Sequence, residues 1–351
     1  MLIVRSPLRI SLAGGGTDLP VYYREFGGKV INLAIDRYFY VFLRTSSEDG
    51  VQIASADFQT YDRIEEDFHF GSLELPRAIF SYFGITRGIN LFLASEAPPG
   101  TGLGSSSTVA VGLIKALVTA VGLQMTKKEL AELASYIEIE RLGAPIGKQD
   151  QYAAAFGSIN LIEFEAGKTT ITPLNLPIDK IQTLTKSLLL FFTGNQRKAN
   201  EILTQQSDAS RRKSQPVLEA LHRVKGMVPQ VKTILEKGDM PGLGNFLHQN
   251  WLEKKRFAQG VTNDFIDQCY EMALHEGAWG GKITGAGGGG FLLLCCPEAR
   301  QRAIIRILAT KGLKRLNFSV DHSGARVLMN SGLRLTSRLS WFPPTNLQRC
   351  V

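Results

Sequence analysis

Three glycine clusters, each beside a segment rich in β-forming residues, constrain this chain more than any other feature of its sequence. They occupy residues 14–16, 100–104 and 285–290. Glycine lets the backbone curl so that successive N–H groups point inward, and such turns bind anions. A single glycine cluster is more often an ordinary loop. Three of them in one chain favour a binding role.

The second cluster lies in the segment Pro98-Pro99-Gly100-Thr101-Gly102-Leu103-Gly104-Ser105-Ser106-Ser107, which runs into a predicted apolar helix over residues 106–121. The start of that helix adds unpaired N–H donors and the positive end of the helix dipole. A triphosphate fits such a site, and a serine hydroxyl at its mouth can reach a magnesium ion bound to the phosphates. A loop with an N-cap is the alternative, but a cap needs one hydroxyl and this segment has three.

Three other phosphate-binding patterns are excluded. Residues 143–148 have one spacer too few for a P-loop, and Gln149 follows where that motif needs serine or threonine. Gly285, Gly287 and Gly290 have the spacing of a dinucleotide fingerprint, but they precede a predicted strand instead of following one. The His-Arg-Asp catalytic loop of protein kinases does not occur.

Length and composition describe a globular protein of two domains. The chain has 351 residues, of which 44% are hydrophobic and 21% charged, and single cores usually stop growing below that length. No apolar run approaches the roughly 20 residues of a membrane span, and residues 1–9 lack the apolar core of a signal peptide. Four cysteines without metal-ligand spacing fit a reducing compartment. We therefore expect a cytoplasmic protein that binds no membrane.

The net charge of +8 is spread along the chain, and no basic stripe interleaved with aromatic residues occurs. We therefore expect no nucleic-acid partner. A solvated basic surface is one explanation for the excess charge. The other is a polyanionic ligand, because positive potential over a cleft raises the local concentration of phosphorylated molecules.

The order of predicted elements indicates an α+β fold. Strand-like and helical segments alternate in the first half, and longer polar helices follow a predicted boundary at residues 174–181. Thr126, three residues before Glu129, predicts a capping box. We expect an N-terminal domain of residues 1–178, a C-terminal domain of residues 179–330 and a flexible tail of residues 331–351. The predicted strands are 2–13, 37–45, 52–54, 89–94, 158–165, 169–173, 291–296 and 317–327, and the predicted helices are 106–121, 126–142, 150–157, 198–237, 264–276 and 297–311.

Three motifs in this order resemble those of the GHMP kinases, the family of galactokinase, homoserine kinase, mevalonate kinase and phosphomevalonate kinase. Pro7-Leu8-Arg9 with Ala13-Gly14-Gly15-Gly16-Thr17-Asp18 resembles motif one, Pro98 to Ser107 resembles motif two, and Lys282 to Gly290 resembles motif three. The resemblance covers residues 1–330. It implies a two-domain GHMP kinase fold, with an N-terminal domain like domain 2 of ribosomal protein S5 and a ferredoxin-like C-terminal domain. It also implies ATP and Mg²⁺ as cofactors.

Within the family, the Ala-Gly-Gly-Gly-Thr-Asp form of motif one and the segment Gly147-Lys148-Gln149-Asp150-Gln151-Tyr152-Ala153 are similar to those of D-glycero-D-manno-heptose 7-phosphate kinases. Those enzymes phosphorylate the sugar at C1, so the resemblance implies a small-molecule sugar phosphate as substrate. The alternatives are a galactose, fucose or mevalonate-like substrate, or a non-catalytic sugar or nucleotide sensor on the same fold. The sequence leaves the oligomeric state open, a homodimer included.

The resemblance also implies roles for individual residues. Asp150 resembles the catalytic aspartate that accepts the hydroxyl proton, although an aspartate at a helix start is also a common cap. Arg9 resembles the basic residue of motif one, with an exposed strand arginine as the alternative. Ser106 and Glu140 would hold magnesium, and Glu138 competes with Glu140. The predicted nucleotide-binding residues are Pro98, Gly100, Gly102, Leu103, Gly104, Ser105, Ser106, Ser107, Gly285, Gly287 and Gly288. The predicted substrate-binding residues are Gly15, Gly16, Thr17, Asp18, Lys148, Gln149 and, for a distal phosphate, Arg197 with Lys198 second.

Overall fold

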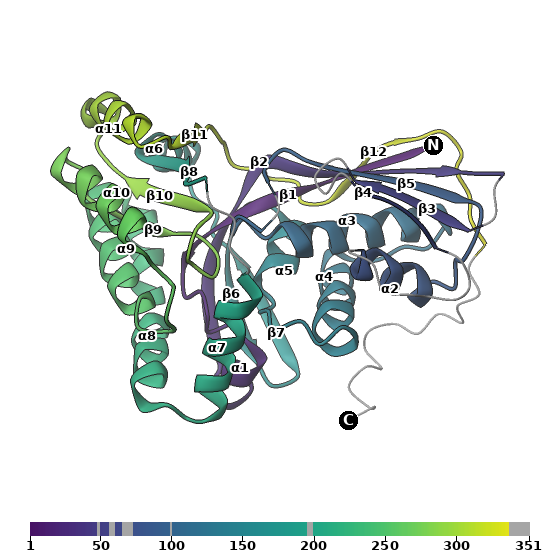
Figure 1. The fold of residues 1–351 in the computed structure, drawn as a ribbon, viewed down its shortest axis with the longest axis horizontal. Coiled ribbons are helices and arrows are strands. Elements are labelled where there is room, and N and C mark those ends of the chain that lie inside the picture. Colours follow the sequence, from purple (N-terminus) through teal and green to yellow (C-terminus); the bar gives the residue numbers. More distant parts are fainter. Residues whose placement is uncertain (48–49, 56–59, 65–72, 99, 195–198, 337–351) are drawn as a thin grey trace.

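The computed structural model describes residues 1–47, 50–55, 60–64, 73–98, 100–194 and 199–336. Two sheets organise these residues (Figure 1). The larger sheet has the strand order β12-β1-β2-β5-β3-β4, and β6 pairs with β2 while β7 pairs with β6. The smaller sheet has the order β11-β8-β10-β9. All pairs are antiparallel except β3 with β5.

The element bounds are as follows. The strands are β1 (Leu2–Ala13), β2 (Gly28–Thr45), β3 (Val51–Ser55), β4 (Thr60–Ile64), β5 (Ile89–Ser95), β6 (Ile159–Glu165), β7 (Lys168–Pro173), β8 (Leu188–Phe192), β9 (Gly280–Ile283), β10 (Phe291–Cys295), β11 (Lys314–Leu316) and β12 (Arg326–Asn330). The helices are α1 (Pro20–Phe26), α2 (Glu74–Tyr82), α3 (Ser105–Ala120), α4 (Lys127–Ser135), the π-helix η1 (Tyr136–Arg141), α5 (Gln149–Phe156), α6 (Ile178–Ser187), α7 (Ala199–Arg211), α8 (Gln215–Lys237), α9 (Met240–Lys254), α10 (Asp264–His275) and α11 (Glu298–Thr310). No helix in the described ranges has the length and apolarity to cross a membrane.

Strand β1 connects the two halves of the molecule. Its residues from Ser6 to Ala13 are all buried, because helices α3 and α5 pack on it from the first half and α8 from the second. Leu8, Ile10 and Leu12 share one apolar cluster with residues of α8, α9 and the smaller sheet. The end of β1, which carries Arg9, therefore lies where the two halves meet.

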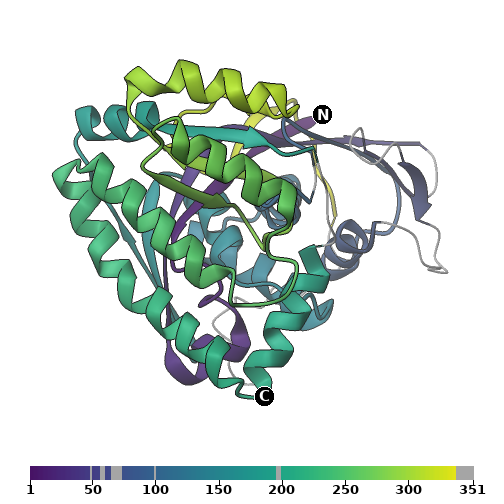
Figure 2. The same cartoon turned by 60° about the vertical axis from the view of Figure 1, so that its left-hand side comes forward.

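The smaller sheet has the ferredoxin-like arrangement that the resemblance implied. Numbered along the chain, its strands lie in the order 4-1-3-2. Strand β10 is apolar at every position because both of its faces are covered. Leu293 packs in the cluster with α8 and α9, and Leu292 packs in the cluster with α10 and α11. Figure 2 brings these helices forward.

The structure corrects several predicted elements. The predicted helix 198–237 is divided, since α7 ends at Arg211 and Lys213 has a positive φ of 50° before α8 begins. Helix α9 was not predicted at all. The strand lies later in the chain than the predicted 317–327. It is β12, which forms the edge of the larger sheet and pairs there with β1.

The first residues of the predicted tail also pack against the first half. Leu333 is buried, and the backbone N–H of Leu335 donates to the carbonyl of Ala120. Residues 331–336 are therefore part of the fold. Residues 337–351 lie outside the described ranges.

Candidate active site

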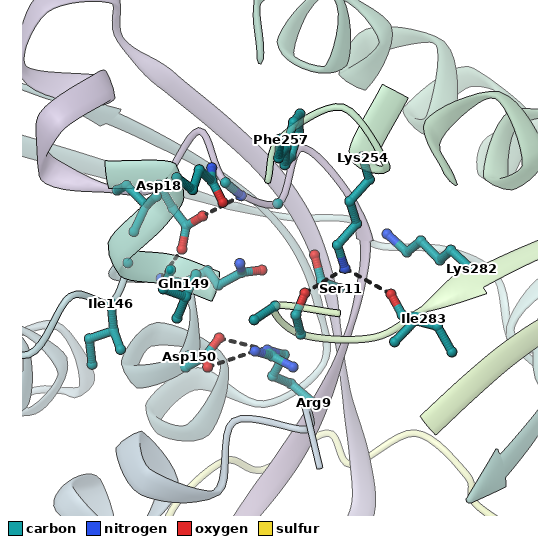
Figure 3. A pocket seen from close by; sticks show the side chains of 18 of the residues that line it. Arg9, Ser11, Asp18, Ile146, Gln149, Asp150, Lys254, Phe257, Lys282 and Ile283 are labelled. Carbon is teal, nitrogen blue, oxygen red and sulfur yellow. Dashed lines mark hydrogen bonds and ion pairs between the residues drawn. The ribbon is translucent and has the colours of Figure 1, made fainter. Parts of the chain in front are cut away.

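A cleft lies where residues of β1, α5, α7 and α9 meet (Figure 3). Both halves of the molecule contribute to its walls. The lining residues are Arg9, Ser11, Gly15, Gly16, Asp18, Leu19, Ile146, Gly147, Gln149, Asp150, Leu203, Gln206, Asn250, Lys254, Phe257, Lys282, Ile283, Gly285 and Ala286.

Arg9 and Asp150 form a bidentate ion pair in this cleft. Arg9 Nε donates to Asp150 Oδ1 and Nη2 donates to Oδ2, both at 2.6 Å. The Arg9 side chain is 5% exposed and that of Asp150 20%. Although Asp150 lies in the first turn of α5, its side chain pairs with Arg9 and does not cap the helix, and the N-cap residue Lys148 makes no capping hydrogen bond with its side chain. The structure therefore brings together the two residues predicted to be catalytic.

Arg9 also binds the second glycine segment. Its Nη1 donates to the carbonyl of Gly102 at 2.5 Å, and its backbone N–H donates to the carbonyl of Leu103 at 3.0 Å. Gly104 follows as the N-cap residue of α3, with a positive φ of 81°. A Cβ on Gly104 would lie 3.1 Å from Asp150 Oδ2. The start of α3 is thus next to the Arg9–Asp150 pair.

The second and third glycine segments pack directly on each other. A Cβ on Gly102 would lie 2.7 Å from the carbonyl oxygen of Thr284, and one on Gly285 would lie 2.4 Å from the Cα of Gly102. Only glycine permits this approach. None of the described residues from Pro98 to Ser107 lines the cleft itself. This segment borders the cleft at Gly104, which lies next to Asp150. No side chain caps the N-terminus of α3.

Part of the third glycine segment lies at the cleft. Gly285 lines the cleft. Gly288 does not line the cleft. Its backbone N–H instead donates to the carbonyl of Val261 at 2.7 Å. Gly287 packs against the same residue, since an added Cβ would lie 2.7 Å from that oxygen. These two glycines therefore anchor the loop on the segment after α9.

Glu138, and not Glu140, meets Ser106. The predicted helix 126–142 changes after Ser135 into the π-helix η1, which alters the direction of its last side chains. Glu138 is 2% exposed; its Oε1 accepts from Ser106 Oγ at 2.8 Å and its Oε2 from Gln151 Nε2 at 2.6 Å. Glu140 instead accepts from Arg24 Nη2 at the surface.

Burial raises the pKa of Glu138 to about 7, and the negative charge of Asp150 adds to this effect. The hydrogen bonds from Ser106 and Gln151 act in the opposite direction. A buried carboxylate without a cationic partner is suited to a metal ion, which favours its ionised form. Among the residues described, no cluster of three or more His, Cys, Asp or Glu side chains could hold a metal alone. An ion here would need phosphate oxygens as further ligands, as magnesium commonly has.

Four of the predicted substrate-binding residues line the cleft: Gly15, Gly16, Asp18 and Gln149. Asp18 is buried, and its carboxylate accepts from the backbone N–H groups of Gly16 at 2.9 Å and Gln149 at 3.3 Å. Burial raises the pKa of Asp18, and the charge of Asp150 raises it further. Its carboxylate is thus fixed in the wall of the cleft.

The structure does not bring the side chains of Thr17 and Lys148 into the cleft. Thr17 Oγ1 lies 2.8 Å from the carbonyl oxygen of Gly14 and 3.0 Å from that of Lys29, shares its one proton between them and so closes the first glycine turn. Lys148 Nζ pairs with Glu132 Oε2 at 3.2 Å. Arg197 and Lys198 lie outside the described residues.

Several lining residues were not predicted. Gln206, Asn250 and Lys254 are on helices α7 and α9, where polar side chains normally face solvent. Lys282 was noted only as the start of motif three. Burial lowers the pKa of Lys254 to about 7, and the charge of Arg9 lowers it further. The same causes, with the charge of Lys254, lower the pKa of Lys282.

Polar atoms without a hydrogen-bond partner gather in this cleft. They are buried, and they belong to lining residues of one strand, β1, and three helices, α5, α7 and α9. Because buried polar groups are nearly always hydrogen-bonded, these atoms are able to bind polar groups of a ligand. The atoms are Ser11 Oγ, Gln149 Oε1, Gln206 Nε2 and Asn250 Nδ2.

Two family models match the chain. Residues 72–158 match the model of the GHMP kinases N terminal domain, and residues 229–314 match that of the GHMP kinases C terminal domain. The chain is 32% identical over 331 residues to D-glycero-alpha-D-manno-heptose 7-phosphate kinase of Campylobacter jejuni. This alignment covers 92% of this chain and 97% of that protein. It is 28% identical to mevalonate kinase of Thermococcus gammatolerans, over 86% of this chain and 92% of that protein.

Solved structures show the same architecture. A D-glycero-D-manno-heptose 1-phosphate kinase from Bacteroides thetaiotaomicron superposes with a TM-score of 0.78 at 27% identity, over 95% of this chain and all of that one.

Proposed function

Because the chain belongs to the GHMP kinase family, we propose that it transfers the γ-phosphoryl group of ATP to the anomeric C1 hydroxyl of a sugar phosphate. D-glycero-D-manno-heptose 7-phosphate is the proposed substrate. The name of the Campylobacter jejuni relative supports this choice. The observation that carries the proposal is the Asp150 carboxylate, held by Arg9 in a cleft lined with unpartnered polar atoms.

Asp150 orients the C1 hydroxyl and accepts its proton as the hydroxyl oxygen bonds to the γ-phosphorus. The bond between that phosphorus and the bridging oxygen breaks, and ADP leaves with the bonding electrons. Arg9 fixes both oxygens of Asp150 and places positive charge beside the transferring group. Phosphoryl transfer depends mainly on such positioning and charge.

The sugar lies along the wall formed by Gly15, Gly16, Asp18 and Gln149. Asp18 accepts hydrogen bonds from sugar hydroxyls, and the amide of Gln149 offers a free oxygen. Gln206, on helix α7, offers its amide Nε2 as a free donor. Neutral donors and acceptors in fixed positions are what a polyhydroxyl ligand requires.

The nucleotide phosphates lie at the segment from Pro98 to Ser107 and at the N-terminus of α3. The absence of a capping side chain leaves the first N–H groups of that helix for an anion. Ser105 Oγ, buried without a partner, is a further donor there.

Ser106 and Glu138 would hold magnesium. Their contact in a buried site and the raised pKa of Glu138 support this assignment. When bound, magnesium neutralises charge on the phosphates. Arg9, which binds the carbonyl of Gly102 just before α3, contributes positive charge to the same region.

An assay of ADP release tests the proposed function. The acceptors are D-glycero-D-manno-heptose 7-phosphate, the 1-phosphate of the same sugar, galactose, fucose and mevalonate. We expect release with heptose 7-phosphate. Release with mevalonate alone would refute the sugar, and release with the 1-phosphate alone would refute C1 as the site of transfer.

A further inference from the structure

Helix α9 presents two polar residues to the cleft, one helical turn apart. Lys254 follows Asn250 by four positions, so their side chains share one face of the helix. Both line the cleft. Neither belongs to the three glycine motifs, and Figure 3 shows Lys254 entering the cleft from a wall different from that of Asp18.

The amide of Asn250 is held with its donor free. Lys282 Nζ donates to Asn250 Oδ1 at 3.4 Å and to the carbonyl of Leu12 at 3.0 Å. Because an ammonium group only donates hydrogen bonds, the amide of Asn250 must turn its oxygen, and not its nitrogen, toward Lys282. Asn250 is 3% exposed, and its Nδ2 has no partner. This donor is available to a ligand in the cleft.

Lys254 also has hydrogen-bonding capacity to spare. Its Nζ donates to the carbonyls of Ile283 at 2.9 Å and Gly285 at 2.5 Å. An ammonium group has three protons, so one is left. Lys254 forms no ion pair with a described carboxylate within 4.0 Å, whereas the next residue, Lys255, pairs with Asp267 Oδ1 at 2.6 Å.

The carboxylates that line the cleft have other partners. Asp150 is bound by Arg9, and Asp18 accepts from two backbone N–H groups. The charge of Lys254 is therefore not neutralised by the protein, and its pKa of about 7 would rise when an anion binds. A free amide donor beside a free ammonium proton matches the oxygens of a phosphate group.

We propose that Lys254, together with Asn250 Nδ2, binds phosphate oxygens in the cleft. This inference rests on the proposed kinase function. The phosphate has two candidate sources, the transferring γ-phosphoryl group and the phosphate already present on the sugar. The contact of Lys254 with Gly285 favours the first, because Gly285 packs on Gly102 of the nucleotide segment.

Calorimetric titrations of the full chain distinguish the two sources. The ratio of ATP to ADP affinity reports the γ-phosphate, and the ratio of heptose 7-phosphate to heptose affinity reports the phosphate on the sugar. We expect Lys254→Met to lower one of these ratios by about 10- to 100-fold, since a hydrogen bond to a charged group is lost. Lys255→Met is the matched control and should leave both ratios unchanged.

Asn250→Asp provides a second variant of almost unchanged volume. It replaces the free donor by an acceptor and should lower the same ratio as Lys254→Met. Circular dichroism of each variant verifies the fold. A fall in the ATP to ADP ratio assigns the γ-phosphate, and a fall in the sugar ratio assigns the sugar phosphate. If Lys254→Met is folded and both ratios equal those of Lys255→Met, the inference is wrong.

These ratios need no turnover. If no acceptor in the ADP-release assay is phosphorylated but Lys254→Met still lowers the ATP to ADP ratio, the proposed function fails and the phosphate site stands.

Discussion

Arg9 reaches both oxygens of Asp150 from a strand that lies 141 residues earlier in the chain. The same guanidinium binds the carbonyl of Gly102. One side chain of β1 thus joins the start of α5 to the glycine segment before α3. The bidentate geometry fixes the direction of the carboxylate, and this direction is what an oriented hydroxyl acceptor needs.

Replacement of Asp150 by Asn should lower kcat by about 10²- to 10⁴-fold, the usual contribution of a positioned general base. The amide keeps the shape of the side chain but cannot take up the proton. ATP affinity, measured by calorimetry, should remain close to that of the wild type. Unchanged kcat in this variant would remove Asp150 from the proposed mechanism.

Glu138→Gln and Glu140→Gln form a matched pair two residues apart. Glu138→Gln should raise the magnesium concentration needed for half-maximal turnover by about tenfold or more, as changes around bound metals commonly do. Glu140→Gln should behave as wild type, because Glu140 pairs with Arg24 at the surface. The assignment fails if the two variants show the same magnesium dependence.

Glu138 should also give the metal-free protein a pH-dependent stability. Its pKa rises from 4.5 to about 7 on folding, mainly through burial. Between these values the folded state retains a proton that the unfolded state has lost, so this contribution to the free energy of unfolding falls as the pH rises. The loss is a few kcal/mol at most, since one pKa unit corresponds to about 1.4 kcal/mol.

Denaturant titrations in EDTA at pH 5 and pH 7.5 measure this effect. Relative to Glu138→Gln, the wild type should lose stability between the two pH values. Parallel behaviour of the two proteins would show that Glu138 does not titrate in this range.

Gly102→Ala should destabilise the fold and weaken ATP binding. The position combines a φ of 81° with a Cβ that would lie 2.7 Å from the Thr284 carbonyl oxygen. Gly122→Ala is the control, because Gly122 has a φ of 77° but nothing within 4 Å of its Cβ. The control should cost only the backbone strain, about 1–2 kcal/mol.

Gly102→Ala should lower the free energy of unfolding by about 1–3 kcal/mol more than Gly122→Ala does, which is the usual effect of overpacking. Chemical denaturation and ATP titration give both quantities. Equal losses for the two variants would show that the contact of the two glycine segments is loose.

The sequence predicted those features that depend on neighbouring residues. Strand β1 has the predicted bounds, and the capping box of Thr126 and Glu129 forms as expected. The apolar run of β10 is a strand covered on both faces. The resemblance of motif one and of the segment from Gly147 to Ala153 to a family was sufficient to predict Arg9 and Asp150 in one site.

Features that depend on distant contacts could not be predicted in this way. No local pattern marks the change from α4 to the π-helix that turns Glu138 toward Ser106. Lys254 resembles a solvated helix residue, because its partners are carbonyls of residues about 30 positions later. Gln206 has the same appearance in sequence, and only the packing of α7 brings it to the cleft.

Phosphorus-31 NMR of the product tests the central claim most directly. The protein is incubated with ATP, magnesium and D-glycero-D-manno-heptose 7-phosphate, and the new phosphate signal is examined for coupling to the anomeric proton. The account predicts a 1,7-bisphosphate whose new phosphate couples to the proton at C1. A new phosphate on any other carbon, or no product while ATP stays intact, would contradict it.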